Sequence, residues 1–239
     1  MGNNITKDMQ FSLNYTRTFG KHDISAMAMY QATNPSYEWM TGFREFMINS
    51  LPVLNAGNDL KQNNGGTEGS SLVMALIGRV NYAYANKYMI EGVLRYDGSS
   101  TFAPDKRWGT FPSVSIGWRI SEEHFFDPLK DAIDNLKIRA SYGSLGNQDL
   151  KDYYPYASVL ALDASYWFGD SKNYTTGIYS NALSNPEISW EKSQQFDFGL
   201  DITAFNTCLD VTFDYYIREI SDMLQQFPVT YAVGLTSPW

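Results

Sequence analysis

Few residues in this sequence could do acid–base, nucleophilic or metal chemistry. The two histidines are His22 and His124, and the one cysteine is Cys208. The run Glu122-Glu123-His124 could in principle hold a metal ion, but adjacent charged residues in a turn are more commonly solvated, and the histidines and cysteine lack zinc-site spacing. Gly143-Ser144-Leu145-Gly146 lacks the centred serine of a nucleophile elbow. We therefore expect no enzymatic activity, no metal site and no cofactor.

The composition excludes two further classes of protein. A net charge of −8 leaves no basic surface for a phosphate backbone, so we expect no nucleic-acid partner. The longest unbroken aliphatic run, 72–77, is far shorter than the roughly 20 residues of a membrane-spanning helix. With 44% hydrophobic residues the chain is ordered. An all-β protein remains, either soluble or membrane-spanning, because barrel strands carry their apolar residues in alternation.

Alternation of apolar and polar residues predicts about eight strands. In one of them Val114 and Ile116 point to one face, whereas Ser113 and Ser115 point to the other. The predicted strands cover 9–19, 24–31, 71–84, 88–96, 111–120, 136–142, 195–202 and 209–218. Charged residues of the polar faces are expected to point into a lumen or toward a plug: Glu91, Arg95, Arg119, Lys137, Arg139, Asp197, Asp210, Asp214 and Arg218.

The links between these strands alternate between short and long. Short links at 20–23, 85–87 and 205–207 alternate with long ones at 32–69, 97–110 and 144–187. Within the first long link, polar residues 63–69 are interpreted as a mobile loop tip or the approach to the next strand. The medium link at 121–135 is assigned to the short side, with a short helix at 127–133 whose first turn contains Pro128. Outer-membrane barrels have tight periplasmic turns and long outer loops, so the alternation favours such a barrel.

Aromatic residues gather near the ends of several predicted strands. Tyr82, Tyr84 and Tyr88 surround one short turn, and Trp118 lies beside another. They are typical of the interfacial girdle of a membrane barrel. The alternative is that these rings fill the core of a soluble sandwich; the alternation of the links favours the girdle.

Several motifs along the chain resemble those of one family. They are Tyr96-Asp97-Gly98-Ser99-Ser100-Thr101-Phe102, Arg107-Trp108-Gly109-Thr110-Phe111-Pro112-Ser113, Gly117-Trp118-Arg119-Ile120-Ser121-Glu122-Glu123, Leu136-Lys137-Ile138-Arg139-Ala140-Ser141-Tyr142-Gly143 with Gly146-Asn147, Asn185-Pro186 with Trp190-Glu191-Lys192, and Asp214-Tyr215-Tyr216 with Asp222-Met223-Leu224. In type and order these motifs resemble the SusC/RagA-type TonB-linked outer-membrane proteins. The family motif residues of interest are Asp97, Gly98, Ser99, Ser100, Gly146, Asn147, Trp190 and Glu191.

The resemblance implies an antiparallel up-and-down transmembrane β-barrel of roughly 22 strands. Residues 1–239 would be a partial barrel domain of about eight strands, without the plug and the remaining strands. The implied function is import of oligosaccharides or peptides across the outer membrane of a Gram-negative, Bacteroidota-like bacterium. The implied partners are outer-membrane lipid, a SusD-like surface lipoprotein, and TonB through the absent N-terminal region.

The two ends of the sequence carry further expectations. The polar start, Met1 to Asp8, has no apolar segment of the kind found in a signal peptide, so we expect either a cytoplasmic protein or a sequence whose start is missing. The end, Thr236-Ser237-Pro238-Trp239, has a proline where a closing strand would need a hydrogen-bond donor, so a loop is expected there. Two alternatives stay open at this stage: a small closed outer-membrane barrel and a soluble β-sandwich binding module.

The long link at 144–187 is rich in aromatic rings, and flat rings suit sugar faces or peptide side chains. Candidate ligand-binding residues are Tyr153, Tyr154, Tyr156, Tyr166 and Trp167. The alternative is that these rings pack the loop against itself or against a partner lipoprotein. The Asp97-Gly98-Ser99-Ser100 turn could bind calcium through its oxygens, but turn chemistry accounts for the same residue types.

Overall fold

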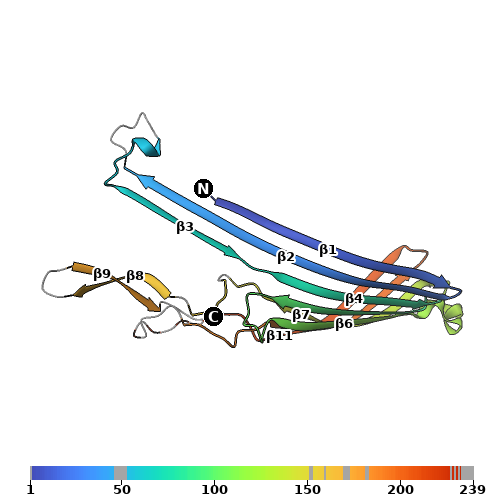
Figure 1. The fold of residues 1–239 in the computed structure, drawn as a ribbon. Coiled ribbons are helices and arrows are strands. Elements are labelled where there is room, and N and C mark those ends of the chain that lie inside the picture. The colour runs from blue at the N-terminus through green and yellow to red at the C-terminus, as the bar shows by residue number, and fades with distance from the viewer. Residues whose placement is uncertain are drawn as a thin grey trace.

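Most of the regular structure is antiparallel β-strand (Figure 1). The computed structural model describes residues 2–45, 53–150, 153–158, 160–168, 173–180, 183–226, 228, 230 and 232, with the backbone alone for 162–168 and 173–176. The main strands are β1 (Gly2–Phe19), β2 (His22–Arg44), β3 (Gln62–Ser70), β4 (Val73–Tyr84), β5 (Tyr88–Ser99), β6 (Trp108–Arg119), β7 (Ile133–Asn147), β10 (Glu191–Ala204) and β11 (Leu209–Ser221). Three short 3₁₀ helices are η1 (Leu54–Ala56), η2 (Ile120–Glu122) and η3 (His124–Leu129). No helix in the described part of the chain has the length and apolar character needed to span a membrane.

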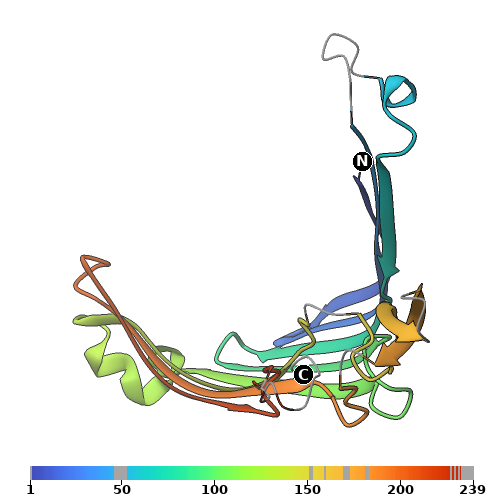
Figure 2. The ribbon, with the colours of Figure 1, turned by 90° about the vertical axis from the view of Figure 1, so that its left-hand side faces the viewer.

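The main strands form one sheet in the order β1-β2-β4-β5-β6-β7-β10-β11, with β3 paired to β2 as well. Each of these pairs is antiparallel and joins strands that follow one another in this meander. Figure 2 shows the sheet bent into an open arc. The prediction of an all-β up-and-down fold is confirmed. The alternative of a small closed barrel is wrong, because β1 and β11 lie at opposite ends of the sheet among the described strands.

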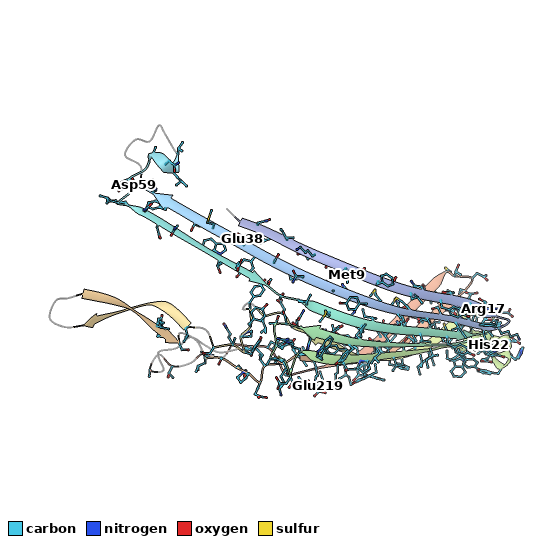
Figure 3. The ribbon with its side chains drawn as sticks, in the orientation of Figure 1. Met9, Arg17, His22, Glu38, Asp59 and Glu219 are labelled. Atoms are coloured by element: carbon cyan, nitrogen blue, oxygen red, sulfur yellow. The ribbon has the colours of Figure 1, made fainter. Side chains whose placement is uncertain are left out.

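The longest strand, β2, spans 23 residues and pairs with two partners in succession. It pairs with β4 as far as Thr33 and with β3 from Ser36 onward. The predicted strand at 24–31 was therefore too short. Residues 63–69, interpreted as a mobile loop tip or the approach to the next strand, form most of β3, which leads directly into β4. We call this projecting part of β2 and β3 the β2–β3 extension; in Figure 3 Glu38 lies on it, and Asp59 lies in the link between the two strands at its tip.

The short links all lie at one end of the sheet, which we call the turn end, and the long links lie at the other, which we call the loop end (Figure 1). Backbone hydrogen bonds join neighbouring turns: Ala85 N donates to Lys21 O at 2.6 Å, Arg119 N to Lys87 O at 2.8 Å, and Phe205 N to Ala132 O at 3.1 Å. The link between β6 and β7 lies at the turn end, as predicted. Its predicted helix at 127–133 is instead the 3₁₀ helix η3, which contains Pro128.

The longest predicted loop contains regular structure of its own. The strand β7 continues to Asn147, and a separate antiparallel hairpin follows, formed by β8 (Leu160–Phe168) and β9 (Asn173–Ser180). The long link predicted at 144–187 therefore begins later than expected, after Asn147, and contains a hairpin. The predicted loop at Thr236–Trp239 lies outside the described residues.

Candidate functional site

The cross-strand register divides the sheet into an apolar face and a polar face, because residues paired directly across antiparallel strands point to the same side. One continuous row on the apolar face is Ile24, Tyr82, Ile90, Ile116, Ala140, Phe198 and Tyr215. The neighbouring row, one residue along each strand, is Ser25, Asn81, Glu91, Ser115, Ser141, Asp197 and Tyr216. A shift of one residue thus exchanges an apolar side chain for a polar one on six of these strands, whereas β11 has a tyrosine at both positions.

No second sheet covers the apolar face within the described residues. Its large side chains are exposed, for example Ile116 at 55% and Phe213 at 56%. A soluble sandwich would bury these side chains between two sheets. The sandwich alternative therefore does not fit the structure.

Charged side chains on the polar face form a bonded group across three strands. Arg139 Nε lies 3.1 Å from Asp201 Oδ2, and its Nη2 lies 2.7 Å from Asp214 Oδ1. The hydroxyl of Thr212 donates to Asp201 Oδ1 at 3.3 Å. These residues come from β7, β10 and β11, so the group joins the strands through side chains as well as through the backbone. The charged residues predicted to share one face do share it by register.

At the loop end, four buried side chains form what we call the rim cluster: Phe102, Phe111, Ile188 and Trp190. Phe102 and Phe111 each have their ring centroid 5.4 Å from that of Trp190. The Trp190 indole N–H donates to Arg107 O at 2.8 Å, and Arg107 Nε donates to Phe102 O at 3.1 Å. The rim cluster therefore ties the link after β5 to the residues before β10, which lie more than 80 positions later in the chain.

The Asp97-Gly98-Ser99-Ser100 motif is the support of the link that follows β5. Asp97 is buried and pairs with Arg95 Nε at 3.1 Å. Ser99 Oγ accepts a hydrogen bond from Thr101 N at 3.2 Å, and Ser100 Oγ accepts one from Leu72 N at 2.9 Å. A side chain at Gly98 would overlap the ring of Trp108. Within the described residues, no three of His, Cys, Asp or Glu lie close enough together to hold a metal ion.

The Gly146-Asn147 and Trp190-Glu191 motifs connect the ends of three strands. The Asn147 side-chain amide donates to Glu191 Oε1 at 3.0 Å, and Leu224 N donates to Glu191 Oε2 at 3.0 Å. Asn147 Oδ1 also accepts a hydrogen bond from Asp149 N at 3.0 Å. Gly146 lies against the ring of Phe111, which leaves no room for a β-carbon. The structure thus brings three motifs together around the rim cluster, although they lie far apart in the sequence: Asp97-Gly98-Ser99-Ser100, Gly146-Asn147 and Trp190-Glu191.

The candidate tyrosines of the long link lie against the sheet and against each other. The Tyr154 hydroxyl donates to Ser70 O at 2.6 Å, and the Tyr153 ring centroid lies 5.3 Å from that of Tyr37. Tyr156 packs against the rim cluster. The side chains of Tyr166 and Trp167 lie outside the described residues, although their backbone belongs to β8. Whether these five residues bind a ligand stays a prediction.

At the turn end, Glu123 bonds to residues with which the sequence did not connect it. Its Oε1 accepts hydrogen bonds from the Tyr88 hydroxyl at 2.6 Å and from the Trp118 indole N–H at 3.3 Å, and its Oε2 lies 3.4 Å from Lys87 Nζ. These hydrogen bonds, that of Tyr88 first, lower the pKa of Glu123. The sequence suggested a solvated turn here; the available signal was that Tyr88 and Trp118 end neighbouring strands at the same end as this turn.

An open antiparallel meander with one apolar face, one polar face and long links at a single end is the architecture of a membrane β-barrel wall. A family model described as "TonB dependent receptor-like, beta-barrel" matches residues 1–237. The chain belongs to this family of TonB-dependent receptor-like β-barrels.

Individual relatives are similar to the chain over most of its length. TonB-dependent receptor P3 of Formosa agariphila is 32% identical over 229 residues, which cover 94% of this chain and 22% of that protein. TonB-dependent receptor SusC of Bacteroides thetaiotaomicron is 35% identical over 162 residues, which cover 66% of this chain and 16% of that protein. The RagAB peptide importer in its closed-closed state superposes with a TM-score of 0.86 at 24% identity, covering 99% of this chain and 26% of that one. The chain therefore spans between about a sixth and a quarter of the proteins that it matches.

Proposed function

We propose that this chain forms part of the barrel wall of an outer-membrane, TonB-dependent transporter that imports oligosaccharides or peptides. The observation that carries the proposal is the pair of neighbouring rows through Ile116 and Ser115, one mainly apolar and one mainly polar across seven strands. Such a wall has hydrocarbon on one side and an aqueous or plug-filled interior on the other. The barrel itself carries out no covalent chemistry in this proposal.

The membrane orientation follows from the cost of charge in lipid. A basic residue on the lipid side costs about 2–4 kcal/mol at the bilayer midplane, so the face with Arg119, Lys137 and Arg139 is the interior. Short turns are typical of the periplasmic end and long loops of the outer end. The turn end with Glu123 is accordingly periplasmic, and the rim cluster lies at the outer mouth.

The rest of the barrel, the plug and the TonB-contacting segment belong to the full-length protein in this proposal. The relatives it resembles are several times longer than this chain, and the sheet has open edges at β1 and β11. Unpaired strand edges cannot stay open in lipid, so further strands must pair there. Residues 1–239 are then a partial barrel domain.

A SusD-like surface lipoprotein is the proposed partner at the loop end. The name RagAB of the structural neighbour and the name SusC of the relative support a two-component importer. The outer mouth, which carries the β2–β3 extension and the β8–β9 hairpin, is the surface that such a partner would cover. Tyr166 and Trp167 of β8 are proposed to line the substrate cavity beneath it, with Tyr153, Tyr154 and Tyr156 nearby.

Uptake by cells that carry the full-length gene tests the proposal. Fluorescent oligosaccharides and peptides are supplied to wild-type cells, to cells without TonB and to cells without the neighbouring lipoprotein gene. We expect accumulation of one ligand class in the wild type and its loss without TonB. Uptake that does not depend on TonB contradicts the transporter assignment. Unchanged ligand affinity after the double substitution Tyr166→Ala and Trp167→Ala removes these two residues from the binding surface.

A further inference from the structure

The link between β6 and β7 is much longer than the other links at the turn end. It runs from 120 to 132 and contains η2 and η3, whereas the others are the short turns 20–21, 85–87 and 205–208. Figure 1 shows this link as the light-green segment at the turn end. A tight turn is enough to join two antiparallel neighbours, so the connection itself does not require the additional residues.

The link begins on the apolar side of the sheet. Glu123 accepts hydrogen bonds from the Tyr88 hydroxyl at 2.6 Å and from the Trp118 indole N–H at 3.3 Å. Tyr88 and Trp118 pair directly across β5 and β6, and both point to the same face as the pair Ile90 and Ile116. These bonds therefore hold the start of the link against the apolar face, at the level of the aromatic rings that end the strands.

The short helix η3 has one polar side. In a 3₁₀ helix the side chains of residues i and i+3 lie on the same side, and His124, Asp127 and Lys130 are spaced in this way. His124 Nδ1 lies 3.9 Å from Asp127 Oδ2, and Lys130 Nζ lies 2.8 Å from Asp127 Oδ1. The residues between them are all apolar: Phe125, Phe126, Pro128 and Leu129. The helix is therefore amphipathic.

One of these apolar side chains attaches the helix to the protein, and two others are left uncovered. Phe126 is buried, and its backbone N–H donates to Glu123 O at 3.0 Å. In the described structure Phe125 is 66% exposed and Leu129 is 52% exposed. Large apolar side chains in water are unfavourable, and neighbouring ones beside a membrane face indicate a surface that binds lipid. Because Phe126 and Glu123 hold the helix, the exposure of Phe125 and Leu129 is a fixed feature of this link.

We propose that η3 is an interfacial anchor whose Phe125 and Leu129 insert among the phospholipids of the periplasmic leaflet, an inference that rests on the proposed membrane location of the wall. The two side chains continue the apolar face beyond Tyr88 and Trp118, and lipid already lies against that face in the proposed function. Amphipathic helices at a bilayer surface lie in the interface, with the apolar side in the lipid and the polar side in water. The anchor holds the β6–β7 end of the wall at a fixed depth.

The charge of the link indicates which phospholipids it meets. Between 120 and 132 the acidic residues outnumber the single basic residue, Lys130. Attraction to anionic headgroups requires a basic segment, so insertion here depends on the apolar side chains. The expected partner is therefore a zwitterionic phospholipid.

Spin labels on the full-length protein test the anchor. Cys208 and any other cysteines are first replaced by serine, and a nitroxide is attached to the single cysteine of Phe125→Cys or Leu129→Cys. The control for the polar side is His124→Cys, at a side chain that is 98% exposed, and the control for the lipid face is Ile116→Cys. Each protein is reconstituted in vesicles of phosphatidylethanolamine and phosphatidylcholine. Electron paramagnetic resonance then measures how often each label collides with oxygen, which dissolves in the bilayer, and with a water-soluble nickel chelate.

We expect the ratio of oxygen collisions to chelate collisions at 125 and 129 to be severalfold higher than at 124 and to lie between the values at 124 and 116. Labels at 125 and 129 that meet the chelate as often as the label at 124 overturn the anchor. Labels shielded from both reagents show that protein covers η3, and this result overturns the anchor as well. A label at 116 that meets the chelate freely counts against the membrane wall itself, so failure of the proposed function is distinguished from failure of the anchor.

Discussion

Arg139 on β7 reaches across Gly199 on β10 to form an ion pair with Asp214 on β11, with Nη2 2.7 Å from Oδ1. Gly199 pairs directly with both residues in the sheet, and a β-carbon there would lie 2.6 Å from Arg139 Cζ. The absence of a side chain at this one position thus lets a charge bridge span three strands on the polar face.

Substitution Gly199→Ala should therefore destabilise the barrel, although alanine normally suits a strand better than glycine. The added methyl group forces the guanidinium away from Asp214, and such overpacking costs about 1–3 kcal/mol. Urea unfolding of the full-length protein in vesicles measures the change. Gly78→Ala is the matched control, because nothing lies within 4 Å of a β-carbon at Gly78. Equal stability of the two variants would show that the bridge contributes nothing.

Glu123 should make stability depend on pH at the turn end. Hydrogen bonds from Tyr88, Trp118 and Lys87 lower its pKa from the ordinary value of 4.5, so the folded protein binds this proton less readily than the unfolded chain. Its stabilising contribution is therefore fully present above about pH 4.5 and is lost as the pH falls through the lowered pKa. Unfolding measured between pH 7 and pH 3 should be less pH-dependent in Glu123→Gln than in the wild type. The control is Glu122→Gln, one residue earlier in the turn; a pH profile of Glu123→Gln that matches the wild type contradicts the prediction.

The alternation of residue types was sufficient to predict most of the sheet. Val114 and Ile116 lie on the same face as the apolar residues of neighbouring strands, because a register shifted by one residue would place polar groups in every apolar row. Successive links of an up-and-down sheet lie at opposite ends, so counting the strands also predicted the end at which each link lies. These features depend on local pattern, so a single sequence is enough to predict them.

The missed features depend on partners distant in the chain. Residues Gln62–Ser70 contain three glycines and little that favours a strand, yet they form β3 because β2 provides a template. In the same way Asn147 and Glu191 could each be recognised in the sequence, but their hydrogen bond joins residues 44 positions apart. The hydrogen bond between Tyr88 and Glu123 also joins residues that lie far apart in the sequence.

Phe111→Ala should be among the most destabilising substitutions at the loop end. Phe111 is 1% exposed and packs against Trp190, so the truncation leaves a cavity in the rim cluster and should cost about 3–5 kcal/mol. Urea unfolding in vesicles provides the measurement. Phe213→Ala, on the exposed apolar face, is the control and should cost less, because lipid can fill the space. A smaller loss for Phe111→Ala than for Phe213→Ala would argue against the rim cluster as a structural core.

The hydroxyl of Tyr154 should restrain the long link against the β2–β3 extension. Tyr154→Phe removes its bond to Ser70 O and keeps the ring, so faster amide hydrogen exchange is expected in 153–158 and near Ser70. The control is Tyr156→Phe, since Tyr156 contacts the rim cluster through packing. Exchange rates that stay the same in Tyr154→Phe would mean that ring packing alone, as between Tyr153 and Tyr37, holds the link.

The orientation of the wall can be tested with two adjacent residues of β6. Ile116 lies in the apolar row and Ser115 in the polar row, next to Glu91 across the strand pair. Ile116→Arg places a charge in lipid and should cost about 2–4 kcal/mol if the position lies near the bilayer midplane. Ser115→Arg places the same side chain in the interior, where Glu91 can pair with it, so a small change is expected. The measurement is the free energy of unfolding of the full-length protein in phospholipid vesicles. If Ser115→Arg were the more destabilising of the two, lipid would lie against the polar face. That result would contradict the proposed orientation of the sheet and the proposal that the polar face lines the interior.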